Sequence, residues 1–207
     1  ETNSHGGNEG QAKNLVYLDK STGQTLSRTY AGHVDYRAKY APVATNGKYM
    51  VYPFGIHDMY GSPAITQNFN RLICADLDNN NWLWDFNVGD IDAMAEPTVT
   101  QNVAIVGTME GYLYALKLGD SAWDDRIAWT FRAKGAVNTQ VTLANERVFF
   151  GCNSGSIYCL DEESGILLWE RSVDPVERGA RKHFSTPLVD GDRVYVGAAN
   201  KRLYALE

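Results

Sequence analysis

The sequence predicts an all-β fold, a β-propeller of four-stranded antiparallel blades, and three observations support this prediction. An apolar run, a glycine, a hairpin and a second apolar run recur in the same order, and the aligned glycines Gly107, Gly151 and Gly197 lie 44 and 46 residues apart. The repeats contain short alternating apolar segments separated by turn residues, which is typical of strands. A period near 45 residues made only of short strands is typical of propeller blades.

Four strands are expected in each repeat, and we letter them A to D from the propeller axis outward. Strand A is short and often carries proline, as in 96–99 and 185–189. Proline is tolerated at the innermost edge of a blade, because that edge has no partner strand. Tight turns such as 45–47 and 190–192 follow strand A. Strand B is the apolar run that ends in glycine, strand C is a Leu-Tyr-Ala-Leu-Asp type segment, and strand D ends on tryptophan.

Each tryptophan of strand D follows a small residue of strand C. Trp84 and Trp169 each lie ten residues after a cysteine of strand C, Cys74 and Cys159 respectively, and Trp129 lies fourteen after Ala115. We expect a large ring over a small buried residue to be the packing contact repeated between blades. Tyr17 and Ser27 take these two positions in the first repeat, and Ala205 takes the small position in the last. The residues expected to pack the blades are Trp84, Trp129, Trp169, Gly107, Gly151 and Gly197.

The chain is expected to form one domain, with both ends falling inside a blade. The predicted divisions are a partial blade at 1–32, full blades at about 38–87, 94–132 and 137–173, and a partial blade at 184–207. We therefore expect about four blades, half of a seven- or eight-bladed ring. Open strand edges invite association, so a homodimer of two half-rings is an alternative arrangement.

Composition argues against several classes of function. The net charge is −6 with acids and bases mixed, which disfavours a nucleic-acid groove. No apolar run approaches the roughly 18 residues that span a bilayer. The three cysteines have no CxxC spacing, so they indicate neither a zinc site nor a disulfide framework. No secretion signal is visible in residues 1–11, an absence that leaves export open.

Binding is expected on the face that carries the B–C and D–A connections. One B–C connection is enlarged to 54–70, and one D–A connection, 174–183, is long and polar. Long connections within compact domains are usually functional or disordered. We expect this face to contact a protein or peptide partner. The candidate partner-binding residues are Phe54, His57, Asp58, Tyr60, Arg178, Arg181, Lys182 and His183.

Metal binding and catalysis are less favoured by the sequence than protein binding. His33, His57 and His183 fall on the same predicted face, but they lack a ligand motif and are interpreted as surface histidines. Asp76, Asp78 and Asn80 resemble the start of a calcium loop. The sixth and twelfth positions of that loop hold asparagine, so a plain turn is favoured. No residue is assigned a catalytic role.

The repeat, with its glycine hairpin, its Leu203-Tyr204-Ala205-Leu206 type strand, its Ser-Gly turn at 164–165 and its final Trp169, resembles the pyrroloquinoline-quinone-like propeller repeats. The resemblance covers nearly the whole chain. It implies a propeller fold, which many functions share.

The resemblance implies two functional branches. Quinoprotein dehydrogenases hold pyrroloquinoline quinone and calcium at the axis, with adjacent cysteines and an aspartate base; this sequence has no adjacent cysteines and no residue that matches the base. The non-catalytic branch, which includes members of outer-membrane β-barrel assembly and of sensor kinases, binds proteins through loops. We favour this branch, without a cofactor and in a periplasmic or extracellular setting, with a quinone-dependent dehydrogenase as the alternative.

Overall fold

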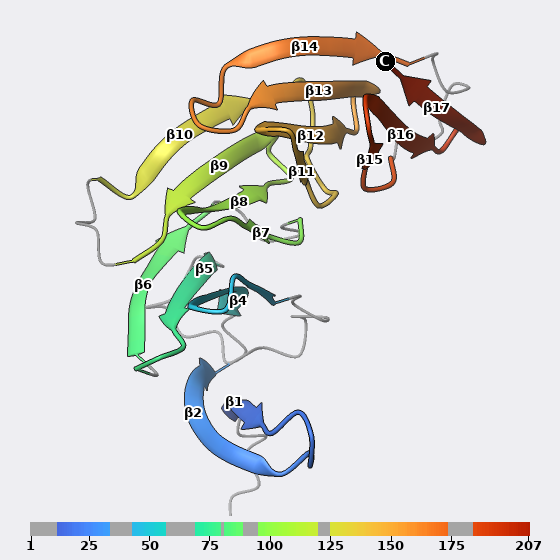
Figure 1. The fold of residues 1–207 in the computed structure, drawn as a ribbon. Coiled ribbons are helices and arrows are strands. Elements are labelled where there is room, and N and C mark those ends of the chain that lie inside the picture. The colour runs from blue at the N-terminus through green and yellow to red at the C-terminus, as the bar shows by residue number, and fades with distance from the viewer. Residues whose placement is uncertain are drawn as a thin grey trace, which may run out of the picture.

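In the computed structural model of this chain, antiparallel sheets follow one another along an arc (Figure 1). The structure describes residues 12–33, 43–56, 69–79, 81–88, 95–119, 125–173 and 184–207. Across these ranges it contains three four-stranded sheets, one three-stranded sheet and one two-stranded sheet. No helix within them is long and apolar enough to cross a membrane. The predicted all-β, propeller-type fold is confirmed.

Each sheet is built from strands that are consecutive in the chain, and each strand pairs antiparallel with the next. The first sheet holds β1 (Ala12–Leu18) and β2 (Thr25–His33). The second holds β3 (Ala44–Thr45), β4 (Tyr49–Ile56), β5 (Phe69–Asp76) and β6 (Asn81–Asn87). The third holds β7 (Thr98–Val99), β8 (Val103–Gly107), β9 (Tyr112–Lys117) and β10 (Ile127–Arg132). The fourth holds β11 (Thr142–Ala144), β12 (Arg147–Cys152), β13 (Ser156–Asp161) and β14 (Leu167–Ser172). The fifth holds β15 (Leu188–Asp190), β16 (Arg193–Ala198) and β17 (Arg202–Leu206).

The sheets fan outward from their first strands. The short strands β7, β11 and β15 lie on the inner side of the arc, and β6, β10 and β14 lie on the outer side (Figure 1). The inner strands also contact one another between sheets, β3 with β7 and β11 with β15. In the four-stranded sheets the four strands therefore correspond to positions A to D, counted outward.

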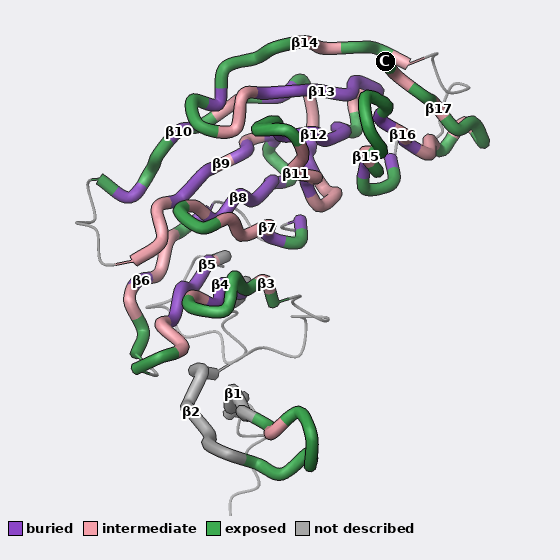
Figure 2. Tube along the Cα trace, viewed as in Figure 1, coloured by how far each residue is buried: buried purple, intermediate pink, exposed green. Residues whose placement is uncertain are grey.

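The apolar core lies between successive sheets (Figure 2). One cluster joins the second and third sheets through Val51, Trp84 and Val106. A second cluster joins the third and fourth sheets, and a third joins the fourth and fifth. Burial is nearly continuous along the middle strands, as in β12 and β13, because both faces of an inner sheet are covered. Each sheet thus depends on the next one for its burial.

Two of the repeated glycines are required by a close crossing. A Cβ atom on Gly107 would lie 2.5 Å from the Val137 side chain, and one on Gly151 would lie 2.6 Å from the Phe184 ring. Val137 and Phe184 belong to the connections that lead into the next sheet. The glycine at the end of strand B therefore lets the D–A connection pass directly over it. At Gly197 the contact is an ordinary 3.4 Å to Ser185.

The strand D tryptophans lie directly opposite the small residues of strand C. The register pairs Trp84 with Cys74, Trp129 with Ala115 and Trp169 with Cys159. Cys74, Cys159 and Ala115 are fully buried. Tyr17 and Ser27 are likewise paired in the first sheet. Ala205 does not follow the expectation of a buried small residue: it is exposed, because no sheet covers that face of the fifth sheet in the described structure.

Candidate functional site

Most of the sequence-predicted binding residues lie outside the described residues. This holds for His57, Asp58, Tyr60, Arg178, Arg181, Lys182 and His183. Phe54 lies inside β4, where its backbone pairs with Arg71, and the pairing of β4 with β5 continues as far as Ile56 and Phe69. Extended pairing therefore takes up both ends of the predicted insertion 54–70. The connection between the two strands is 57–68, and the backbone of Phe54 belongs to a strand.

The described B–C and D–A connections lie at one end of the sheets and bond to one another. We call their described residues, 108–111, 133–138, 152–155 and 198–201, the loop face. The Val137 amide donates to the Thr108 carbonyl at 2.9 Å, and the Ala133 amide donates to the Gly111 carbonyl at 2.8 Å. The Asn153 amide of the fourth sheet donates to the Ala136 carbonyl at 2.9 Å. The connection 133–138 is therefore fixed between the hairpins of two successive sheets.

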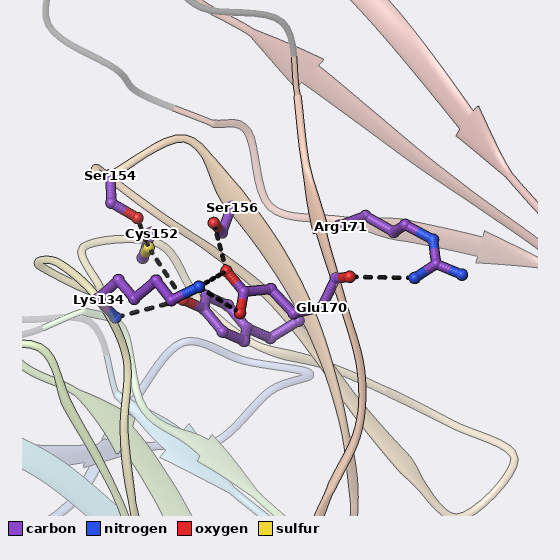
Figure 3. A network of polar contacts seen from close by, with 7 residues as sticks. Lys134, Cys152, Ser154, Ser156, Glu170 and Arg171 are labelled. Carbon is purple, nitrogen blue, oxygen red and sulfur yellow. Dashed lines mark hydrogen bonds and ion pairs between the residues drawn. The ribbon is translucent and has the colours of Figure 1, made fainter.

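A polar network extends this attachment to the outer strand of the fourth sheet (Figure 3). Lys134 Nζ lies 2.8 Å from both carboxylate oxygens of Glu170, and Ser156 Oγ donates to Glu170 Oε1 at 2.7 Å. The Lys134 amide donates to the Tyr158 hydroxyl at 3.2 Å. Figure 3 also shows Cys152 Sγ and Ser154 Oγ, which lie 2.8 Å apart. The network thus ties a connection of the third sheet to β13 and β14.

The ionisation of the network follows from these contacts. The hydrogen bonds from Lys134 and Ser156 lower the pKa of Glu170 below its usual range. Burial raises the pKa of the Tyr158 hydroxyl to about 12. Glu170 is therefore an anion and Tyr158 is neutral at neutral pH. This ion pair positions the loop, because it joins Lys134 of the connection to Glu170 of β14.

Sequence reasoning missed an aromatic and cationic group beside the same face. The Arg132 guanidinium lies 4.1 Å from the centre of the Tyr112 ring, and the Tyr112 and Tyr114 rings stack at 5.7 Å. Met109, at the tip of the neighbouring hairpin, is 40% exposed. Tyrosine, arginine and methionine are enriched at protein interfaces. An apolar residue at a hairpin tip was the signal available in the sequence at Met109.

The calcium-loop hypothesis is answered in part by the described residues. Asp76 Oδ1 accepts the backbone amides of Asp78 and Asn79 at 2.8 and 3.2 Å, and Asn80 lies outside the described residues. The corresponding Asp161 accepts the amide of Ser164 in the same manner, at 2.9 Å. This is a turn closed by an aspartate side chain. The Asp76 carboxylate is thus engaged in closing its own turn.

A quinone and calcium site of the quinoprotein type needs adjacent cysteines and a cluster of metal ligands. Cys74, Cys152 and Cys159 are free and buried, and none is adjacent to another. No group of three His, Cys, Asp or Glu side chains lies together in the described ranges. The described residues do not fit the ligand set of a quinoprotein.

Comparison with known protein families gives a match over almost the whole chain. Residues 11–207 match the PQQ_2 family, which is described as outer membrane protein assembly factor BamB. The outer membrane protein assembly factor BamB of Escherichia coli strain K12 is 31% identical over 120 residues, which cover 53% of this chain and 28% of that protein.

Solved structures show the same fold. The crystal structure of BamB from Moraxella catarrhalis superposes with a TM-score of 0.65 at 16% identity, over 89% of this chain and 53% of that one. The computationally designed Ika8 protein superposes with a TM-score of 0.66 at 15% identity, over 91% of this chain and 50% of that one. The chain therefore spans about half the length of these structures.

Proposed function

The chain belongs to the outer membrane protein assembly factor BamB family of PQQ-like propeller repeats, and we propose that it is part of a non-catalytic scaffold that binds a protein through its loop face. The observation that carries the proposal is the attachment of connection 133–138 to two hairpins and to β14. A loop held in this way loses little conformational freedom on binding.

The composition of the loop face supports a protein ligand. Met109 offers an exposed apolar side chain, and the exposed Arg132 stands over Tyr112 in its neighbourhood. Lys134 is 67% exposed although it is paired with Glu170. An apolar anchor within a polar rim is the usual anatomy of a protein interface. The candidates Phe54, His57, Asp58 and Tyr60, and the group from Arg178 to His183, remain proposals as further contacts on this face.

The family relation also supports a location and a class of partner. The similar proteins are named for the assembly of outer membrane proteins. We accordingly propose that this chain acts in the bacterial envelope and that its function there is to bind other proteins. Two partners fit that name: a folded component of the assembly machinery and an unfolded outer membrane protein.

A matched pair of substitutions tests the proposal. Met109→Arg places a charge on the loop face, and Ile166→Arg places the same charge in a C–D turn, where Ile166 is 65% exposed. Binding of the immobilised chain to purified assembly machinery and to a urea-unfolded outer membrane protein is measured separately. We expect Met109→Arg to weaken one of these complexes by about tenfold, the effect of losing one anchor residue. Ile166→Arg should leave the affinity unchanged.

Two results of these binding measurements would contradict the proposal. If neither probe binds, or if both variants lose the same affinity, the loop face is not the binding surface. Thermal melting of both variants accompanies the binding measurement, because equal melting temperatures separate a lost contact from a lost fold. Replacement of 57–68 by a short glycine-rich turn, which keeps the paired ends Ile56 and Phe69 of β4 and β5, gives a second variant: it should weaken capture while the remaining sheets still melt cooperatively.

A further inference from the structure

The turn between β3 and β4 contains an exposed asparagine, Asn46, followed directly by Gly47, and this is the only Asn-Gly pair in the sequence. Gly47 adopts φ of +91°, and a Cβ atom on it would meet nothing within 4 Å. Because glycine has no side chain to shield its backbone nitrogen, an asparagine before it is open to attack on its carboxamide by that nitrogen. The pair is therefore a candidate site of spontaneous deamidation, which converts the carboxamide to a carboxylate.

Deamidation at this pair needs water and no other reactant. The Gly47 nitrogen, once it has given up its proton, bonds to Cγ of Asn46, the Cγ–Nδ2 bond breaks, and ammonia leaves with a proton to give a cyclic imide. Water then opens the imide at Cγ, which yields aspartate, or at the main-chain carbonyl, which yields isoaspartate. The attacking nitrogen must come within about 3–3.5 Å of Cγ in the correct alignment. The rate therefore depends on whether the folded chain lets these two atoms meet.

Hydrogen bonds hold both polar atoms of the Asn46 carboxamide. Nδ2 donates to the Thr100 carbonyl at 2.8 Å, and Thr100 belongs to the corresponding turn of the third sheet. Oδ1 accepts the backbone amides of Lys48 and Tyr49 at 3.1 and 2.8 Å. The carboxamide therefore closes its own turn with one atom and joins two sheets with the other.

The attacking nitrogen is engaged as well. The Gly47 amide donates to Thr45 Oγ1 at 3.0 Å, and that hydroxyl donates to the Tyr49 carbonyl at 2.8 Å. For the reaction to occur, the nitrogen must leave Thr45 and Cγ must turn toward it, which breaks the bond to Thr100. That bond lies beside the contact of β3 with β7 and the apolar cluster around Val51 that joins the second and third sheets. Separation of these two sheets therefore releases the carboxamide.

Conversion to aspartate would keep the turn and lose the bond between the sheets. Asp190 occupies the equivalent position in the fifth sheet, where Gly191 follows with φ of +57°, so this kind of turn accepts an aspartate. A carboxylate at position 46 still accepts the amides of Lys48 and Tyr49, but it has no N–H for the Thr100 carbonyl. Two oxygens then face each other across the interface, and a carbonyl that has lost its donor raises the free energy of the folded state.

We propose that Asn46 is a deamidation site that the contact between the second and third sheets keeps unreactive, and that its conversion irreversibly weakens this same contact. Each separation of the two sheets exposes the carboxamide, and each conversion makes further separation easier. The equivalent residues of the third and fourth sheets are Thr100 and Ala144, which have no carboxamide. The modification therefore acts on the interface between the second and third sheets.

The rate of conversion is measured on the whole chain at pH 8 by mass spectrometry of the tryptic peptide 40–48, with a synthetic peptide of that sequence as the unfolded reference. We expect the folded chain to react at least ~10-fold more slowly than the peptide, because the reaction proceeds from the opened turn. Val51→Ala, in the core between the second and third sheets, should accelerate the reaction. Val196→Ala, in the core between the fourth and fifth sheets, should leave the rate unchanged.

A third variant decides the matter if Val51→Ala does not fold. Thr45→Val removes the acceptor of the Gly47 amide and leaves the apolar core intact, so it should accelerate the reaction of the folded chain relative to a peptide with the same substitution. A folded chain that reacts as fast as the peptide would overturn the proposal. Equal acceleration by the two core valine variants, or no acceleration by Thr45→Val, would overturn it too.

The weakened contact is tested separately by thermal melting of Asn46→Asp, the product of the reaction. We expect its melting temperature to fall by ~2–4 °C through the lost bond to Thr100. Asn102→Asp makes the same charge change at an exposed turn position of the third sheet and should melt almost as the original chain does. Equal melting of the two variants would show that conversion does not weaken the contact, and the proposal would be wrong.

Discussion

Gly165 lies against the indole of Trp129, so closely that a Cβ atom at Gly165 would stand 2.5 Å from the ring. Gly23 has almost the same backbone, with φ of +71° against +69°, and closes the same kind of turn. Gly23 has open space where its Cβ atom would be. The two turns therefore share a backbone requirement and differ in whether a ring covers them.

Substituting each of these two glycines by alanine separates the cost of left-handed backbone strain from the cost of steric contact with a ring. Gly23→Ala should cost about 1 kcal/mol, the usual effect of an L side chain in the left-handed region. Gly165→Ala should cost a further ~1–3 kcal/mol, because the methyl group forces the indole to move. Urea unfolding of both variants measures the difference. Equal losses would show that Trp129 adapts freely.

Trp129→Phe removes the indole N–H and leaves the Glu162 carbonyl without that donor. We expect a loss of about 1–3 kcal/mol in the free energy of unfolding, from the unmade hydrogen bond and the smaller ring. Trp82→Phe is the control, since Trp82 is 46% exposed. Its stability in urea should be almost unchanged; a loss equal to that of Trp129→Phe would contradict the contact.

The lowered pKa of Glu170 predicts that the free energy of unfolding depends on pH. Its pKa is lowered in the folded chain by the hydrogen bonds from Lys134 and Ser156. A lowered folded pKa contributes stability that is present above the unfolded value, about 4.3, and is lost as the pH falls through the folded value. Glu170→Gln should therefore flatten the decline of stability below about pH 4.3. Unfolding from pH 3 to 7 tests this, with Glu163→Gln at an exposed turn position as control.

The left-handed backbone of Lys201 predicts that a glycine at this position stabilises the chain. Its φ is +63°, and its amide donates to the Ala198 carbonyl, as the Gly155 amide does to Cys152 in the preceding sheet. Lys201→Gly should raise stability by about 0.5–1 kcal/mol by relieving the left-handed strain. Lys201→Ala removes the same charge and keeps the strain, so it should gain nothing. A gain common to both variants would assign the effect to the side chain instead.

Two thiols should be unreactive in the folded chain. Burial raises the pKa of Cys74 to about 12 and that of Cys159 to about 11. The thiolate is the reactive form, so burial suppresses both access and ionisation. Alkylation at pH 8, followed by mass spectrometry, should label neither residue until denaturant is added. Rapid labelling of either one would show that its sheet interface opens.

The repeat made the sheets predictable, because alternation of apolar residues and regularly spaced glycines follow directly from strand geometry. The pairings of Trp84 with Cys74 and of Trp169 with Cys159 followed from their shared ten-residue spacing. The ion pair of Lys134 and Glu170 did not, since it joins two repeats through a loop whose path depends on neighbouring hairpins. The sequence predicts Phe54 in a connection because Pro53 stands where other repeats have the glycine that ends strand B, yet the strand continues through Phe54 to Ile56.

The serial arrangement of the apolar clusters has a consequence for how the chain comes apart. Each interface joins only adjacent sheets, so opening free energies accumulate neighbour by neighbour instead of residing in one nucleus. The third and fourth sheets are each held from both sides, the third by the clusters around Val106 and Phe150 and the fourth by those around Phe150 and Val196. Amide hydrogens of β8, β9, β12 and β13 should therefore exchange with deuterium last, and those of β17 early.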